Sequence, residues 1–245
     1  MSQQENFVSH LVELRDRLLR AVIGFLIVFV ALMAYPGAAY IFDLLALPIQ
    51  SALPEGTKMI ATGVITPFMV PVKLTAMVAF VISLPILLYQ AWSFIAPGLY
   101  VHEKKMALPI IFSSTVLFLL GIAFCHFIVF GKVFAFINDF APQSITPAPD
   151  IEAYMSFVLT MFMAFGMTFE VPIVVVVLVY LGVVTVEKLA EVRGYVIVAA
   201  FVIAAIVTPP DVMSQLFLAI PICILYEVGI LFAKVIGKQR QQIME

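Results

Sequence analysis

Acidic side chains are the main candidates for chemistry in this sequence. Glu13 lies in a polar stretch near the N-terminus, and Glu103 lies in the short charged cluster 102–105. A carboxylate accepts two hydrogen bonds from one guanidinium group, so two carboxylates on one face would suit a ligand with paired arginines. The alternative is structural: Glu13 pairs with Arg17 one helical turn away, and Glu103 belongs to a solvated loop.

Glu170 is a different case, because it interrupts a long apolar run between Tyr154 and Val184. A charge at the centre of a membrane helix costs roughly 2.5 to 3.5 kcal/mol, so its burial requires a partner, water or protonation. The polar side chains available as partners inside other apolar runs are Gln215, Thr208 and His126. We interpret Glu170 as a functional polar element in a wet cavity, with a paired structural acid as the alternative.

Two further acids have mainly structural interpretations. Asp211 follows Pro209-Pro210 and precedes an apolar run, which predicts that it caps the next helix rather than binds a ligand. Glu227 lies near the end of that run, where it can snorkel or pair with Lys234; a functional role for it stays equally open.

Motifs for enzyme chemistry are absent from the sequence. It contains no H-E-x-x-H, no G-x-S-x-G and no nucleotide-binding glycine loop, and its three histidines are scattered. Cys125 and Cys223 lie in apolar runs and are expected to behave as small hydrophobes. The formal charge of -2 gives no reason to expect nucleic acid. We therefore predict no enzyme activity, no metal, no cofactor and no nucleic-acid partner.

Composition shows which elements must position these residues. With 64% hydrophobic and 11% charged residues, the chain has too few charges to cover a water-soluble domain, so the lipid bilayer must be part of its solvent. The sequence predicts an all-α membrane protein forming a single polytopic domain over residues 1–245. The six predicted spans cover approximately 21–42, 72–92, 106–130, 153–184, 194–208 and 212–233.

Basic residues predict the orientation of these spans. If the connecting segments alternate between the two sides of the membrane, ten of the 13 Lys and Arg residues fall on one side. The positive-inside rule identifies this side as the cytoplasm, and both termini lie on it. The ten are Arg15, Arg17, Arg20, Lys104, Lys105, Lys188, Arg193, Lys234, Lys238 and Arg240, against Lys58, Lys73 and Lys132.

Several local patterns refine this picture. Span five has only 195–207 before Thr208-Pro209-Pro210, about 20 Å of helix against a bilayer core of roughly 30 Å. We expect a tight hairpin of short fifth and sixth spans and a locally thinned membrane. Residues before Ala21 predict an interfacial helix with Glu13–Arg17 and Asp16–Arg20 pairs. Prolines predict kinked spans, and ordered caps in the periplasmic loops 43–71 and 131–150.

Several segments together resemble the TatC family, the polytopic subunit of the twin-arginine protein translocase. They occur in the expected order and cover essentially the whole chain. They are HLVELRDR at 10–17, SFIAPGLY at 93–100, EK at 103–104, FGMTFEVP at 165–172, TPPDVMSQ at 208–215, and the run from Pro221 to YE at 226–227. One such motif alone is weak evidence, but this ordered set in a six-span topology is specific.

The resemblance implies a receptor for twin-arginine signal peptides and core subunit of an oligomeric translocase in the bacterial inner membrane. It would export folded proteins using the proton-motive force, together with single-span partners of the TatA and TatB types. The resemblance implies that Glu13, Arg17, Phe94 and Glu103 bind the signal peptide. It implies a concave membrane face of kinked helices around Glu170 and partner contact at Thr208 and Gln215. It also implies a periplasmic cap shaped by Pro48, Phe68 and Asp211. The main alternative is a proton-coupled secondary transporter with Glu170 as proton carrier.

Overall fold

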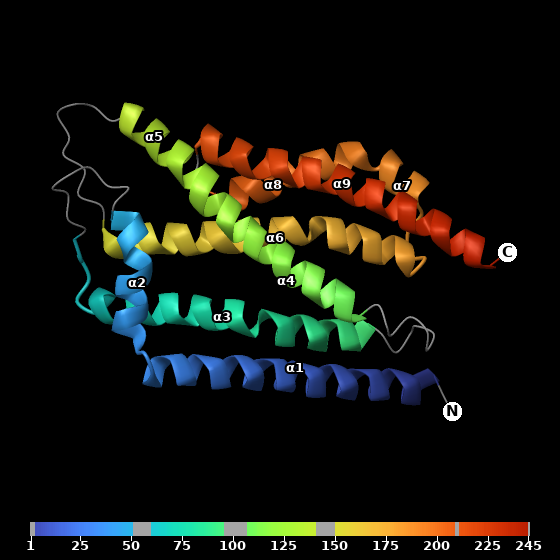
Figure 1. Ribbon diagram of the computed structural model, residues 1–245, viewed down its shortest axis with the longest axis horizontal. Helices are drawn as coiled ribbons and strands as arrows, with labels where there is room; N and C mark the ends of the chain where they lie inside the picture. Colours follow the sequence, from blue (N-terminus) through green and yellow to red (C-terminus); the bar gives the residue numbers. More distant parts are fainter. Residues whose placement is uncertain (1–2, 51–59, 96–106, 141–149, 209–210, 245) are drawn as a thin grey trace. The chain divides into compact units, whose positions relative to one another are not determined.

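The computed structural model of the chain describes residues 3–50, 60–95, 107–140, 150–208 and 211–244, and these are almost entirely helical (Figure 1). A helix bonds its backbone groups internally, which is what a lipid environment requires. The segments in order are α1 (Gln3–Ala34), α2 (Ala38–Gln50), α3 (Thr66–Ile95), α4 (Ala107–Phe124), the π-helix η3 (Cys125–Val129), α5 (Phe130–Phe140), α6 (Ile151–Tyr180), α7 (Val186–Glu191), α8 (Arg193–Val207) and α9 (Val212–Met244).

Among the described residues, five helical segments are long and apolar enough to cross a membrane, and α8 is a shorter sixth. The five are Leu11–Ala34, Thr66–Phe94, Leu108–Phe136, Ile151–Tyr180 and Val212–Val235. The all-α class and the count of six are confirmed. The prediction that span six is also short is wrong, because α9 has 33 residues and its apolar part alone has 24.

The first span differs from its prediction at both ends. The polar N-terminal stretch is no separate interfacial helix, since α1 runs without a break from Gln3 to Ala34. It ends there, well before residue 42, because Pro36 has no N–H group and Gly37 adopts a positive φ of 95°. The amide of Gly37 donates to the carbonyl of Leu32 at 3.0 Å, and α2 then begins at Ala38.

Contacts divide the chain into two compact units, of which the first comprises Met1–Thr115 and Ala148–Met155. In it α1 and α3 lie side by side, and a Cβ on Gly24 would meet Ile86 Cγ2 at 3.2 Å (Figure 1). The two helices run in opposite directions, so the N-terminal end of α1 and the C-terminal end of α3 are at the same end of the pair (Figure 1).

The second unit comprises Val116–Pro147 and Ser156–Glu245. Here α4 meets α6 at two glycines. A Cβ on Gly121 would clash with the carbonyl oxygen of Phe165, and a Cβ on Gly166 would lie 2.5 Å from the ring of Phe118. Only glycine permits so close an approach of the two backbones. Gly229 of α9 has a similar role against the backbone of Pro172 in α6.

The third span contains a π-helix that the sequence does not predict. Cys125–Val129 separates α4 from α5, and the Phe130 amide donates to the carbonyl of Cys125. The ring of His126 lies among aromatic rings, edge-on to Phe127 and tilted against Phe162. A π-turn inside a membrane helix keeps its backbone groups bonded within the helix and re-aims the side chains that follow it.

Three elements lead to the C-terminus. After α6, Gly182 turns the chain with φ at 72°, and Thr185 caps α7 by accepting a hydrogen bond from the Lys188 amide. The 15 residues of α8 span about 22 Å, and the helix ends at Thr208 directly before the two prolines. Helices α8 and α9 then lie side by side (Figure 1).

Candidate functional site

Asp150 joins two distant parts of the first unit, at the predicted periplasmic end of the spans. Its Oδ2 accepts hydrogen bonds from the amide and hydroxyl of Thr62, at 3.1 and 2.6 Å. Its Oδ1 accepts from the amides of Glu152 and Ala153, which are in the first turn of α6. Four donors on one carboxylate, the Thr62 hydroxyl foremost, lower the pKa of Asp150 to about 2.

The neighbouring acid strengthens the same junction. Glu152 receives the Lys73 ammonium at 2.8 Å and the Thr66 hydroxyl at 2.9 Å, and both donors are in the first turns of α3. The amide of Ile151 adds a backbone bond to Ile60. We call this network, made by Asp150 and Glu152 with Thr62, Thr66 and Lys73, the pin. The sequence did not predict these residues, and the expectation of ordered caps in the loops 43–71 and 131–150 stays a prediction, because residues 51–59 and 141–149 are outside the described residues.

The predicted cap residues near the pin are placed only in part. Phe68 lies exposed in the first turn of α3. Pro48 lies in α2, and its side chain is outside the described residues. Their role in shaping the cap stays a prediction.

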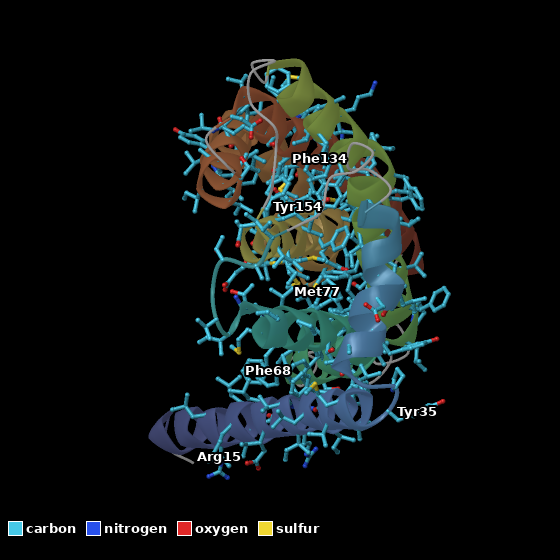
Figure 2. All side chains as sticks on the ribbon, turned by 90° about the vertical axis from the view of Figure 1, so that its left-hand side faces the viewer. Arg15, Tyr35, Phe68, Met77, Phe134 and Tyr154 are labelled. Carbon is cyan, nitrogen blue, oxygen red and sulfur yellow. The ribbon has the colours of Figure 1, made fainter. Side chains whose placement is uncertain are left out.

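At the opposite end of the first unit, α1 carries the predicted binding acid. Glu13 Oε1 accepts hydrogen bonds from both Nε and Nη2 of Arg17, the former at 2.9 Å. No donor among the described residues meets its second oxygen, Oε2. The predicted Asp16–Arg20 pair is wrong, because Asp16 binds Arg15 at 2.8 Å (Figure 2 shows Arg15 on the side of α1 away from α3).

The same end of the first unit holds Phe94, in the last turn of α3 and half-buried. The structure therefore brings Glu13, Arg17 and Phe94 to one end of the α1/α3 pair, while Glu103 is outside the described residues. Gln90 lies one turn before Phe94 on the same face of α3. Its Oε1 is shielded from solvent and accepts no hydrogen bond in the described part of the chain, and no sequence motif marks it.

In the second unit Glu170 lies in α6, ten residues before Tyr180 ends the helix, and its Oε1 is shielded from solvent. Asp211 caps α9, as predicted, by accepting a hydrogen bond from the Ser214 amide at 2.7 Å. The hydroxyl of Thr208 donates to the carbonyl of Ala204, and Gln215 is half-buried. Sequence reasoning missed Ser214, whose buried hydroxyl makes no hydrogen bond in the described part of the chain.

Glu227 has a partner other than the one predicted. It pairs with Arg193 at the start of α8 instead of Lys234, with Nε to Oε1 at 2.6 Å and Nη2 to Oε2 at 2.9 Å. The adjacent Tyr226 donates to the carbonyl of Leu189 at 2.8 Å. Both oxygens of Glu227 are occupied, so we interpret this pair as a structural clamp between α8 and α9.

Together these features define a class: a polytopic, all-α membrane protein whose charged groups gather at the ends of its spans. The described residues include no group of His, Cys, Asp and Glu side chains that could hold a metal ion.

Comparison with known proteins gives the family. The family model described as "Sec-independent protein translocase protein (TatC)" matches residues 9–221. Proteins of that name from Haemophilus influenzae and Escherichia coli K12 are 51% and 44% identical, each over 96% of this chain and 91% of the relative. A "Crystal Structure of Twin Arginine Translocase Receptor- TatC" is 42% identical with a TM-score of 0.80, covering 92% of this chain and 98% of that one. The chain belongs to the TatC family.

Family membership confirms the resemblance found in the sequence. The family is a component of a protein translocase, so the chain is a transport protein of the membrane. This decides against the proton-coupled secondary transporter that Glu170 suggested as an alternative.

Proposed function

We propose that this chain is the signal-peptide receptor and core subunit of a twin-arginine translocase in the bacterial cytoplasmic membrane. The observation that carries the proposal is the carboxylate of Glu13, whose Oε2 meets no donor among the described residues, at the same end of the first unit as Phe94. A guanidinium group is the natural donor for such a carboxylate. The similar protein of known structure is described as a twin-arginine translocase receptor, which supports the same conclusion.

In this mechanism the two arginines of a signal peptide pair with Glu13 and Glu103. Arg17 holds the carboxylate of Glu13, and the ring of Phe94 packs against apolar parts of the peptide next to the arginines. Charge-assisted bonds between planar, matching groups give both affinity and geometric selectivity. The excess of basic residues on this side supports a cytoplasmic position for both termini, which is the side where folded passenger proteins would be presented.

Later steps would use the second unit. Single-span partners of the TatA and TatB types would contact α8 and α9 near Thr208 and Gln215, where the buried hydroxyl of Ser214 offers a further polar group. The 15 residues of α8 span about 22 Å, which is less than the bilayer core of roughly 30 Å. The membrane would therefore thin locally around the hairpin of α8 and α9. Glu170 would meet polar groups inside the membrane. Transport would draw on the proton-motive force.

An export assay tests the proposal. The chain is produced with its single-span partners in a bacterium that lacks its own receptor subunit, with a folded fluorescent reporter behind a twin-arginine signal peptide. We expect export of the folded reporter, its loss when both arginines become lysines, and its arrest by an uncoupler. Equal export of the arginine and lysine reporters would contradict a receptor role.

A further inference from the structure

The Arg193–Glu227 pair lies on a surface that is otherwise apolar. Side chains three, four and seven residues apart share one face of a helix, and those that share the face of Glu227 on α9 are Ile220, Ile224, Leu231 and Lys234. The three apolar side chains are all exposed, two of them before Glu227 and one after it. The ion pair therefore interrupts a lipid-facing stripe of α9 and does not lie at its end.

The length of the apolar span shows how far inside it the pair lies. The apolar part of α9 ends at Val235, eight residues or about 12 Å beyond Glu227. On α8, Ile197 follows Arg193 by one turn and is also exposed. Both charged side chains of the pair are 46% exposed, so the chain itself covers only about half of each. Such a pair is unfavourable among acyl chains unless a further polar group meets it.

The short helix α7 supports the presence of polar headgroups at this level. It packs beside the last apolar turns of α9, where Leu189 is buried in one cluster with Tyr226 and Ile230. Its side chains Lys188 and Glu191 pair with each other and are 64% and 66% exposed, which suits water or headgroups rather than acyl chains. A headgroup drawn down to the Arg193–Glu227 pair meets the demands of both helices.

Arg193 has donors left for such a headgroup. A guanidinium carries five N–H groups, and Glu227 takes two of them, one from Nε and one from Nη2. Each oxygen of Glu227 already meets one of these nitrogens, so the hydrogen-bonding capacity that is left in the pair is mainly that of donors. Lys234, about two turns further along the same face of α9, adds a second exposed cation. The surface therefore suits acceptor oxygens that carry negative charge.

We propose that Arg193 and Lys234 bind the phosphate of an anionic phospholipid, whose acyl chains cover the apolar stripe of α9. Phosphate oxygens accept hydrogen bonds from guanidinium and ammonium groups, and basic groups beside membrane helices are typical sites for lipid headgroups. A headgroup without an ammonium group fits best, because Glu227 is already paired and Lys234 repels a further cation. Phosphatidylglycerol is such a lipid. The site is independent of the proposed receptor role.

A lipid bound there also matches the short α8 to the bilayer. The 15 residues of α8 begin at Arg193, so the bound phosphate lies at the level where this helix starts. Helix α9 continues from there to Met244, so the headgroup is lowered only on the α8 side. The lipid thus provides the local thinning that a short helix requires.

The test is a titration of the full chain in detergent with phosphatidylglycerol, with the lipid-bound fraction measured by native mass spectrometry. The double variant Arg193→Gln/Glu227→Gln removes one positive and one negative charge, so the net charge of the chain is unchanged. We expect it to weaken binding of the tightest lipid about tenfold, and Lys234→Gln to weaken it about threefold. Lys132→Gln is the matched control, because it removes an exposed lysine of α5 and should bind lipid as the unmodified chain does.

The outcomes decide the proposal. Weaker binding by the double variant, with Lys132→Gln unchanged, supports the lipid site, whereas equal binding by the double variant and the unmodified chain overturns it. If the double variant does not fold, Lys234→Gln leaves the ion pair intact and must weaken binding by itself. A photoreactive residue at position 231, in membranes that also contain single-span partners, should crosslink to phosphatidylglycerol. A crosslink to a partner instead would assign this surface to a partner helix and overturn the lipid site.

Discussion

The two ends of the first unit use the same residue types in opposite ways. At the pin, Asp150 and Glu152 accept hydrogen bonds from Thr62 and Lys73, about 80 positions away, and so join the start of α6 to the start of α3. At the other end, the partners of Glu13 and Asp16 among the described residues are arginines of their own helix. Hydrogen bonds between distant elements restrain the fold, whereas bonds within one helix leave the arrangement of the elements free.

Saturation of the acids shows the same contrast. All four oxygens of Asp150 and Glu152 accept hydrogen bonds, while Glu13 offers one oxygen to Arg17 and its other oxygen meets no donor in the described part of the chain. An acid with satisfied oxygens has a structural role, and an acid with an open oxygen near the surface is ready for a ligand. The difference distinguishes the pin from the end of the first unit that carries Glu13, which we propose as the binding end, and substitutions can act on either one alone.

The largest effect is expected at the binding end. Glu13→Gln removes the charge that a guanidinium requires, so affinity for a twin-arginine peptide should fall about tenfold or more. Fluorescence binding to the chain in nanodiscs measures it. Asp16→Asn changes the same charge on the same helix but acts on an exposed pair, and should bind the peptide normally. Equal losses in both variants would mean that only the net charge of α1 matters.

The next effect is expected at the pin. Asp150→Asn places an amide NH2 group against donors that need an acceptor, so it should release residues 60–66 and lower the apparent unfolding temperature by roughly 5 °C. Thermal unfolding in detergent and hydrogen exchange at residues 60–66 report the change. Asp43→Asn is the control, since Asp43 is an exposed acid of α2 that takes no part in the pin. Unchanged exchange at 60–66 would contradict the pin.

A smaller effect is expected from the ion pair within the pin. Lys73 and Glu152 are both nearly half exposed, so Lys73→Gln should lower the unfolding temperature by no more than about 2 °C. The difference should also disappear in about 1 M salt, which screens exposed charges. A loss as large as that of Asp150→Asn would show that the pair, and not the helix cap, holds the pin together.

The smallest effect is the response of the pin to pH. The folded-state pKa of Asp150 is about 2, below its ordinary 3.8, so its contribution to stability is present above about pH 4 and is lost as the pH falls toward 2. The difference in unfolding temperature between the unmodified chain and Asp150→Asn should therefore stay constant from about pH 5 to about pH 8. A difference that changes in that range would assign the stabilisation to another group.

Local rules in the sequence predict much of this fold. Long stretches without charged residues locate the spans, because a charged side chain in lipid is unfavourable unless it has a partner, water or a proton. The stop at Thr208-Pro209-Pro210 predicts a short α8, and Asp211 after it predicts the cap of α9. Each of these depends on residues close together in the chain, where spacing translates directly into geometry.

Contacts between distant residues are what the sequence does not reveal. Nothing near Asp150 points to Thr62, and Glu227 has an obvious neighbour in Lys234 but pairs with Arg193 across two helices. The π-helix at Cys125–Val129 depends on packing around it and has no sequence signal of its own. For the binding end, the sequence points to Glu13 and Phe94, but only the structure shows that Glu13 is already half occupied.

The most direct test of the central claim, that the end of the first unit with Glu13 and Phe94 receives paired arginines, is photo-crosslinking. A photoreactive residue at position 94 is exposed, in membranes containing the chain, to signal peptides with paired arginines or paired lysines. We predict a crosslink with the arginine peptide that is lost with the lysine peptide and with Glu13→Gln. Crosslinks of equal strength from both peptides, or a crosslink that survives Glu13→Gln, would contradict the claim.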